Sequence, residues 1–175
     1  MKKILAVMLS VCMLFCLCAC DFAKDIADLA ANDTPKDKTF DLDGISIELN
    51  TNFLRMDFLD KEEYDFIVGD ENISIFGVKA PFEDTGLENC TVLEYTDLFY
   101  QQMTSLDIDA EIIEDNGIKM VKYTDIDGDG EESNYVVAFY KAQDYFWVIT
   151  FAVDAKDYEQ LYPDICKYVK SVKCN

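Results

Sequence analysis

Half of the 175 residues are hydrophobic, which predicts a folded core rather than a disordered acidic polymer. The chain contains no histidine, which excludes Ser-His and Cys-His catalytic pairs and histidine-ligated zinc sites. Its formal net charge of −20 at neutral pH argues against nucleic-acid binding and against lying flat on an acidic membrane, because the phosphates would be repelled.

Residues 1–19 have the pattern of a secretory signal peptide. Lys2 and Lys3 are followed by an apolar run to Leu17 that only Ser10 clearly interrupts. The run is shorter than the about 20 apolar residues that a membrane-spanning helix needs. We therefore predict that this segment directs export.

The end of this segment, Leu17-Cys18-Ala19-Cys20, resembles the lipobox of bacterial lipoproteins. Leu17 and Ala19 occupy the leucine and small-residue positions of that family, while Cys18 is an unusual occupant. The resemblance implies that a diacylglycerol is joined to the Cys20 thiol and that cleavage leaves Cys20 first. Acyl chains such as palmitate would then hold the protein on the extracytoplasmic face of the cell membrane. A cleaved signal with a secreted product and a retained membrane anchor are the alternatives.

Residues 20–38 are predicted to be the acylated cysteine and a flexible tether. The stretch is polar and contains Asn32-Asp33-Thr34-Pro35, a typical loop sequence. Residues 39–175 have the length of one ordinary globular domain.

Alternation of apolar and polar residues between turn residues predicts two groups of β-strands. The expected strands lie at 40–42, 45–49, 64–68 and 73–79, and, after a helix, at 108–114, 118–124, 134–141 and 145–153. The Asp43-Gly44 and Asn116-Gly117 pairs are typical of tight hairpin turns. The last two strands are apolar on both faces, so each face of the sheet needs a covering layer.

The predicted helix between the two groups follows a loop at 81–89 and runs from about 92 to 105. Thr91 is its expected N-cap, because Glu94 three residues later completes a capping box. Its expected inward face consists of Leu93, Tyr95, Leu98, Phe99, Gln102 and Leu106.

A second helix is predicted at about 156–172, where Pro163 should kink it or restart it. Its expected apolar stripe is Tyr158, Leu161, Tyr162, Ile165, Val169 and Val172. The order of strands, helix, strands and helix predicts an α+β fold, an antiparallel β-sheet with helices packed on it.

This order of elements, with Ile45, Ile47 and Leu49 alternating before Phe53 and a last helix ending near Ser171, resembles PsbP-like domains. Gram-positive lipoproteins of unknown function have the same pattern. The resemblance implies an α/β/α sandwich. Because PsbP-like domains are mostly assembly or binding modules, it favours binding over catalysis.

Three cysteines, Cys90, Cys166 and Cys174, remain beyond the predicted lipid site, and an odd number cannot all pair within one chain. A continuous helix would separate Cys166 from Cys174 by about 12 Å, too far for a disulfide. We expect no disulfide, although an unwound tail would let these two meet.

The most distinctive local motif is the stretch 125–132, which resembles the first half of an EF-hand loop. Calcium takes six to eight oxygen ligands, and carboxylates at alternate positions followed by glycine can surround one ion. The hypothetical ligands are Asp125, Asp127, Asp129 and Glu131, or Glu132 in place of the last. The EF-hand's twelfth position holds Val136 here, so the alternative is a surface turn rich in Asp and Gly.

The function that the sequence favours is a non-enzymatic binding or assembly module, anchored to the membrane and contacting an envelope protein. It would need no cofactor, calcium excepted. The enzymatic alternative is a carboxylate-dependent hydrolase, because 35 acidic residues can conceal a catalytic pair. Arg55, the single arginine, could anchor an anionic ligand or be an ordinary surface residue.

Overall fold

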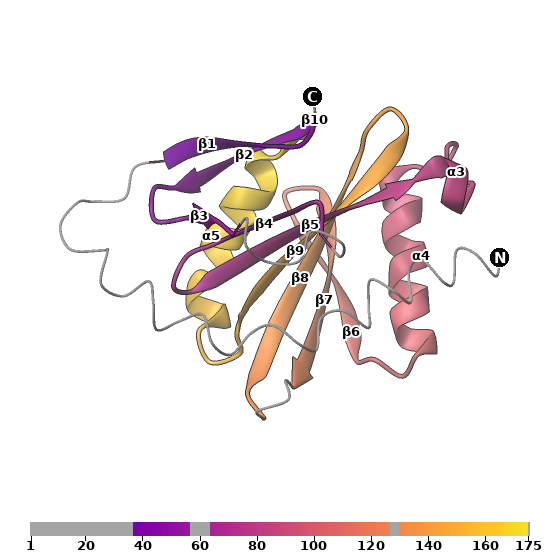
Figure 1. Cartoon of the computed structure of the whole chain (residues 1–175). Helices are drawn as coiled ribbons and strands as arrows, with labels where there is room; N and C mark the ends of the chain where they lie inside the picture. Colours follow the sequence, from indigo (N-terminus) through magenta and orange to yellow (C-terminus); the bar gives the residue numbers. More distant parts are fainter. Residues whose placement is uncertain (1–36, 57–63, 127–129, 175) are drawn as a thin grey trace.

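The computed structural model describes residues 37–56, 64–126 and 130–174. They form two antiparallel sheets with helices packed on them (Figure 1), which confirms the predicted α+β class. The predicted signal peptide, Cys20 and the tether up to residue 36 lie outside these ranges. Among the helices that the structure describes, none is both long enough and apolar enough to cross a membrane.

The smaller sheet brings the two ends of the described chain together. Its strands, in spatial order, are β1 (Asp37–Leu42), β2 (Ile45–Asn50) and β10 (Lys173–Cys174). Asp43 and Gly44 have positive φ angles, 45° and 105°, as a tight two-residue hairpin turn with both central residues in the left-handed region requires. β1 begins at Asp37, two residues inside the predicted tether. β10 was not predicted.

The larger sheet has seven strands in the order β3-β4-β5-β9-β8-β7-β6, each antiparallel to its neighbours. They are β3 (Leu54–Arg55), β4 (Phe66–Gly69), β5 (Ile73–Pro81), β6 (Ala110–Asp115), β7 (Ile118–Ile126), β8 (Glu132–Lys141) and β9 (Tyr145–Asp154). All but β3 were predicted, with small shifts at their ends. β8 and β9 are buried on both faces, as expected.

A glycine allows an aromatic ring to lie across the larger sheet. Gly77 in β5 pairs with Phe66 in β4. A Cβ atom on Gly77 would lie 2.0 Å from Cε1 of Phe66, so the ring occupies the space of the missing side chain. The same ring packs against Trp147, with 5.6 Å between the ring centroids.

One face of the larger sheet is covered by α5 (Tyr158–Ser171) and the smaller sheet (Figure 1). α5 is one helix through Pro163, so of the two expected outcomes, a kink or a restart, the restart is wrong. Pro163 has no amide proton, so the carbonyl of Glu159 loses its usual donor. The proline is tolerated because both residues are exposed to water. The predicted apolar stripe is buried or partly buried against this face, and Cys166 and Tyr168 are also buried.

The opposite face is covered by α4 (Val92–Ser105), which begins at the predicted capping box. The Glu94 amide donates to the Thr91 hydroxyl at 3.2 Å, and the Thr91 amide donates to the Glu94 carboxylate at 2.8 Å. Ahead of it, α3 (Phe82–Thr85) occupies part of the predicted loop.

The inward face of α4 differs from the prediction. Its buried residues are Tyr95, Thr96, Phe99 and Met103. Leu93, Leu98 and Leu106 are 50%, 41% and 39% exposed. A helix turns about 100° per residue, which places positions 95, 99 and 103 on one stripe and puts Leu93 and Leu98 on its two flanks.

Candidate functional site

The predicted calcium loop connects β7 to β8. Asp125 lies near the end of β7 and Glu131 just before β8, while Asp127 and Asp129 lie outside the described residues. Asp125 pairs with Ser133 across the hairpin, so the two ends of the loop are neighbours. One carboxylate oxygen of Asp125 accepts the amide of Ile126 at 2.8 Å. Within the described ranges, no group of three or more Cys, Asp or Glu side chains is arranged to hold a metal ion, and calcium binding stays a prediction.

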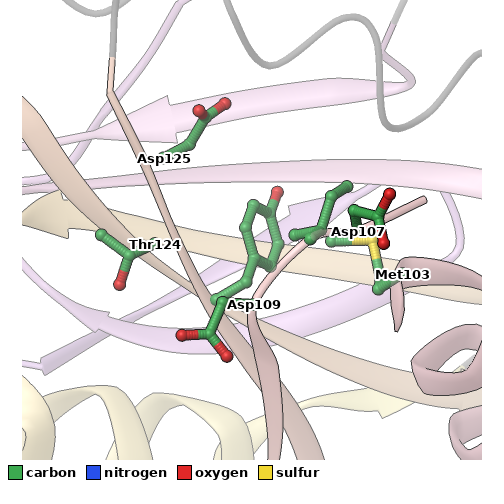
Figure 2. Close-up of a pocket in the computed structure, with 7 residues that line it drawn as sticks. Met103, Asp107, Asp109, Thr124 and Asp125 are labelled. Atoms are coloured by element: carbon green, nitrogen blue, oxygen red, sulfur yellow. The ribbon is translucent and has the colours of Figure 1, made fainter. Parts of the chain in front are cut away.

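A pocket of about 240 Å³ lies beside this loop, between the end of α4 and β7 (Figure 2). It is lined by Met103, Asp107, Ile108, Asp109, Tyr123, Thr124 and Asp125. Figure 2 shows the carboxylates of Asp109 and Asp125 pointing in opposite directions. A two-carboxylate hydrolase needs its pair to face each other across the substrate, about 5–10 Å apart. Asp109 and Asp125 are therefore not arranged as such a pair.

A second hollow, of about 620 Å³, lies where β5 and β9 end beside α3. We call it the α3 groove, and its lining residues are Pro81, Phe82, Glu83, Glu88, Gln143, Asp144 and Tyr145. Pro81 and Tyr145 are paired across the two strands. The Phe82 amide donates to the Asp144 carbonyl at 2.9 Å, which joins α3 to the β8–β9 turn. The groove was not predicted from the sequence, because its lining residues come from segments about 60 residues apart.

Two lysines lie against aromatic rings beside the α3 groove, on opposite faces of the larger sheet. Lys141 lies 5.5 Å from the centroid of the Phe82 ring, and its Nζ donates to the carbonyls of Glu88 and Cys90 at 2.7 and 2.8 Å. Lys79 lies 5.4 Å from the centroid of the Tyr145 ring and forms ion pairs with Asp43 and Asp65. Partial burial lowers the pKa of Lys79, but the hydrogen bond to Asp43 and the nearby carboxylates outweigh it, and the pKa is raised.

The remaining candidate residues do not assemble into a site. Arg55 is exposed in β3 and lines neither hollow. The thiols of Cys90, Cys166 and Cys174 are free. Burial raises the pKa of all three, so at neutral pH they are protonated and poorly nucleophilic.

No protein-family model matches the chain, and no curated protein matches it in sequence. Solved structures do match. The Ran-binding protein Mog1p of Saccharomyces cerevisiae is 13% identical with a TM-score of 0.53, over 81% of this chain and 96% of that chain. A mutant of Mog1 gives the same score and identity over 79% and 96% of the two chains. Cyanobacterial PsbP (CyanoP) from Synechocystis is 11% identical with a TM-score of 0.48, over 85% and 99%. At such identities the likeness to Mog1 concerns the fold alone, and the described domain has that antiparallel α+β fold.

Proposed function

We propose that the protein is an extracytoplasmic lipoprotein, held at the cell membrane through Cys20, whose α+β domain is a non-enzymatic binding or assembly module. The observation that carries the binding role is the contrast between the two hollows. In the pocket beside β7 the carboxylates of Asp109 and Asp125 point apart, whereas the larger α3 groove offers the partly exposed ring of Phe82, which packs against the buried Phe146. Rigid aromatic surface is what protein recognition uses.

The fold is compatible with this role. Mog1p, which shares it, is a Ran-binding protein, so a domain of this architecture can serve protein recognition. The resemblance of the sequence to PsbP-like assembly modules points the same way. The partner we propose for this chain is another protein of the cell envelope.

The lipid anchor is tested by labelling the protein with radioactive palmitate in a bacterial host and separating membrane from soluble fractions. We expect wild type to carry label in the membrane fraction, and Cys20→Ala to lose both label and membrane association. Cys18→Ala is the matched control, because it changes the neighbouring cysteine and should keep both. An unlabelled wild-type protein, or label that survives in Cys20→Ala, would contradict the anchor.

The binding role is tested by cross-linking intact cells and identifying the protein joined to this one. The purified pair should then bind reversibly in solution. Phe99→Ala, which removes a ring from the core under α4, is the control for dependence on the folded domain. Absence of a cross-linked protein, or an equal yield with the destabilised variant, would refute a folded binding module.

A second candidate role is calcium binding at the β7–β8 hairpin. The observation that favours it is the register of Asp125 with Ser133 and of Ile126 with Glu132, which makes the two ends of the acidic loop neighbours. We expect the melting temperature to rise more in millimolar calcium than in magnesium of equal ionic strength. Replacing Asp127 and Asp129 by Asn should abolish the difference. Equal melting temperatures in the two salts would reduce the motif to a turn.

A further inference from the structure

We propose that two copies of this chain pair edge to edge through β6, with Ile112 of one copy opposite Ile112 of the other. This pairing goes beyond the proposed binding function and does not depend on it. Three properties of β6 support it: the edge of the strand is open, its acidic residues are balanced by lysines, and its sequence is complementary to itself in one register.

The outer edge of β6 is free to pair. β6 is the last strand of the larger sheet and, among the described strands, it pairs with β7 alone. The turn at 116–117 is closed by the pair of Asp115 and Ile118. In a hairpin with a two-residue turn, this closing pair and every second pair beyond it are hydrogen-bonded. The residues whose amide and carbonyl groups point to the open edge are therefore Ala110, Ile112 and Glu114.

An apolar side chain lies at the centre of this edge. Ile112 is 38% exposed, whereas its neighbour Val121 in β7 is fully buried. The strand is paired with β7 residue by residue over its whole length and contains no proline. A regular edge strand with an exposed apolar centre is a template for pairing with another strand.

The charges along β6 are locally balanced, although the whole chain has a formal net charge of −20. Each acid of the strand has a lysine beside it: Glu111 has Lys122, Glu114 has Lys119, and Asp115 has Lys170. The first and last of these form ion pairs, and the middle two residues are directly opposite each other in the register of β6 with β7. A second copy therefore meets a nearly neutral edge.

One symmetric register keeps the acids of the two copies apart. When an antiparallel pair is centred on Ile112, Ile112 faces itself, Ala110 faces Glu114 and Glu111 faces Ile113. A centre at Glu111 would place that acid against itself, and a centre at Ile113 would place Glu111 against Asp115. Because like charges directly opposite destabilise a strand pair, the register centred on Ile112 is favoured.

The other sheet edges are less suited to such pairing. β3 and β10 have two residues each. β1 has six, and by the same alternation its outward residues are Asp37, Thr39 and Asp41. A symmetric pair centred on Thr39 would place Asp37 directly against Asp41. β1 is therefore protected by its charges, whereas β6 is not.

The experiment measures the molar mass of the full-length protein in a non-ionic detergent by sedimentation equilibrium. A strand pair of this length buries little surface, so the dimer is expected to be weak and protein concentrations of about 0.01–1 mM are needed. About 0.15 M salt screens the repulsion between the net charges of the copies beyond about 8 Å.

Two variants with the same charge change are compared. Ile112→Glu places like charges opposite each other at the centre of the proposed pair. Leu54→Glu is the control, because Leu54 is 45% exposed in β3 at the other edge of the same sheet. We expect Ile112→Glu to weaken dimerisation about tenfold or more, and Leu54→Glu about twofold or less. Melting temperatures close to that of wild type establish that the variants fold.

A charge exchange tests the register. Ile112→Lys alone should also weaken the dimer, but a mixture of Ile112→Lys with Ile112→Glu should form heterodimers about tenfold more tightly than either variant forms homodimers. Such rescue is expected only if position 112 faces itself.

Hydrogen exchange of wild type provides a measurement that needs no variant. The amides of Ile112 and Glu114 should exchange more slowly as the protein concentration rises.

A wild-type protein that stays monomeric at about 1 mM would overturn the proposal. So would equal losses of dimer in Ile112→Glu and Leu54→Glu, because dimerisation would then respond to net charge alone. A dimer without heterodimer rescue, or without protection of these two amides, would place the contact elsewhere on the molecule and would equally overturn pairing through β6.

Discussion

The two faces of the larger sheet are closed in different ways. The face under α4 is covered by a helix whose neighbours, β7 and β8, follow closely in the sequence. The face under α5 is covered by both ends of the described chain, and the Ser171 hydroxyl accepts the amide of Glu48, 123 residues away. Bringing distant segments together costs more chain entropy and slows folding. The α4 face should therefore form first, and the α5 face should open first.

The chemistry of the two cores differs as well. Under α4, Tyr95 stacks on Phe146 with centroids 4.3 Å apart, and Phe99 packs against Phe139 at 5.1 Å. Under α5 the core is mainly aliphatic, although it includes the buried Trp147. Removing a side chain from either core tests whether the two faces unfold as one unit.

The largest expected effect comes from Phe99→Ala. Phe99 is 2% exposed, so losing the ring leaves a cavity and should reduce the free energy of unfolding by about 3–5 kcal/mol. Leu98→Ala, on the exposed flank of the same helix, should change it by less than about 0.5 kcal/mol. Urea denaturation followed by circular dichroism measures both. A large loss of stability in the Leu98 variant would mean that the side chain of Leu98 faces the core, and would contradict the orientation of α4.

Alkaline pH should weaken the α5 face. Burial raises the pKa of Tyr162 and Tyr168 to about 12, and it raises that of Tyr158 further. Tyrosines in an unfolded chain ionise near pH 10. A raised folded pKa gives stability that is complete below the unfolded pKa and is lost as pH rises through the folded pKa. The free energy of unfolding should therefore fall between about pH 10 and about pH 12, together with the appearance of tyrosinate absorbance.

Phe substitutions separate the contributions of the tyrosines. Tyr162→Phe and Tyr168→Phe each remove an ionisable group, so the alkaline loss should shrink in both. An unchanged pH profile would place the titrating groups elsewhere, for instance at Tyr95 under α4, whose pKa burial also raises.

Thr91→Ala should have a smaller effect on the α4 face. It removes one half of the capping box and should cost about 0.5–2 kcal/mol. The Thr91 amide and hydroxyl lower the pKa of Glu94 below its ordinary value. The stability from this contact is therefore complete above the ordinary glutamate pKa and is lost as pH falls through the folded pKa. The difference between wild type and Glu94→Ala should vanish in acid, and a constant difference would contradict the cap.

The smallest effect is expected for Ser171→Ala on the α5 face. The Ser171 hydroxyl accepts the Glu48 amide at 2.9 Å and donates to the Tyr168 carbonyl at 2.7 Å, so its loss should cost about 0.5–1.5 kcal/mol. Hydrogen exchange of the Glu48 amide should accelerate, while amides of β8 and β9 stay protected. Ser105→Ala, whose hydroxyl bonds within its own helix, is the control and should leave the Glu48 amide unchanged.

The fold was largely predictable because its long elements have clear periodicity. The helix starting after Thr91 and the strands β4 to β9 follow from alternation, turns and a capping box. β3, α3 and β10 have two to four residues each and were missed, since such short elements have no period and depend on tertiary neighbours. The stripe of α4 was misplaced because Leu93 and Leu98 are apolar but lie on its flanks.

The candidate sites were less predictable. The acidic pattern from Asp125 onward was visible in the sequence, and Asp125 lies at the predicted hairpin. The α3 groove was not visible, because the segments that line it meet only through the pairing of β5 with β9. A sequence pattern shows what lies along one segment, whereas a groove requires knowledge of which segments meet.

The ring of Phe66 over Gly77 has a consequence for the evolution of this chain. Any side chain at position 77 would displace the ring, and losing the ring would leave Gly77 uncovered beside Trp147. The two positions should therefore covary: homologues with a larger residue at position 77 should have a smaller one at position 66. The glycine–aromatic pair would then help to identify distant members of the lineage whose overall identity is too low to align with certainty.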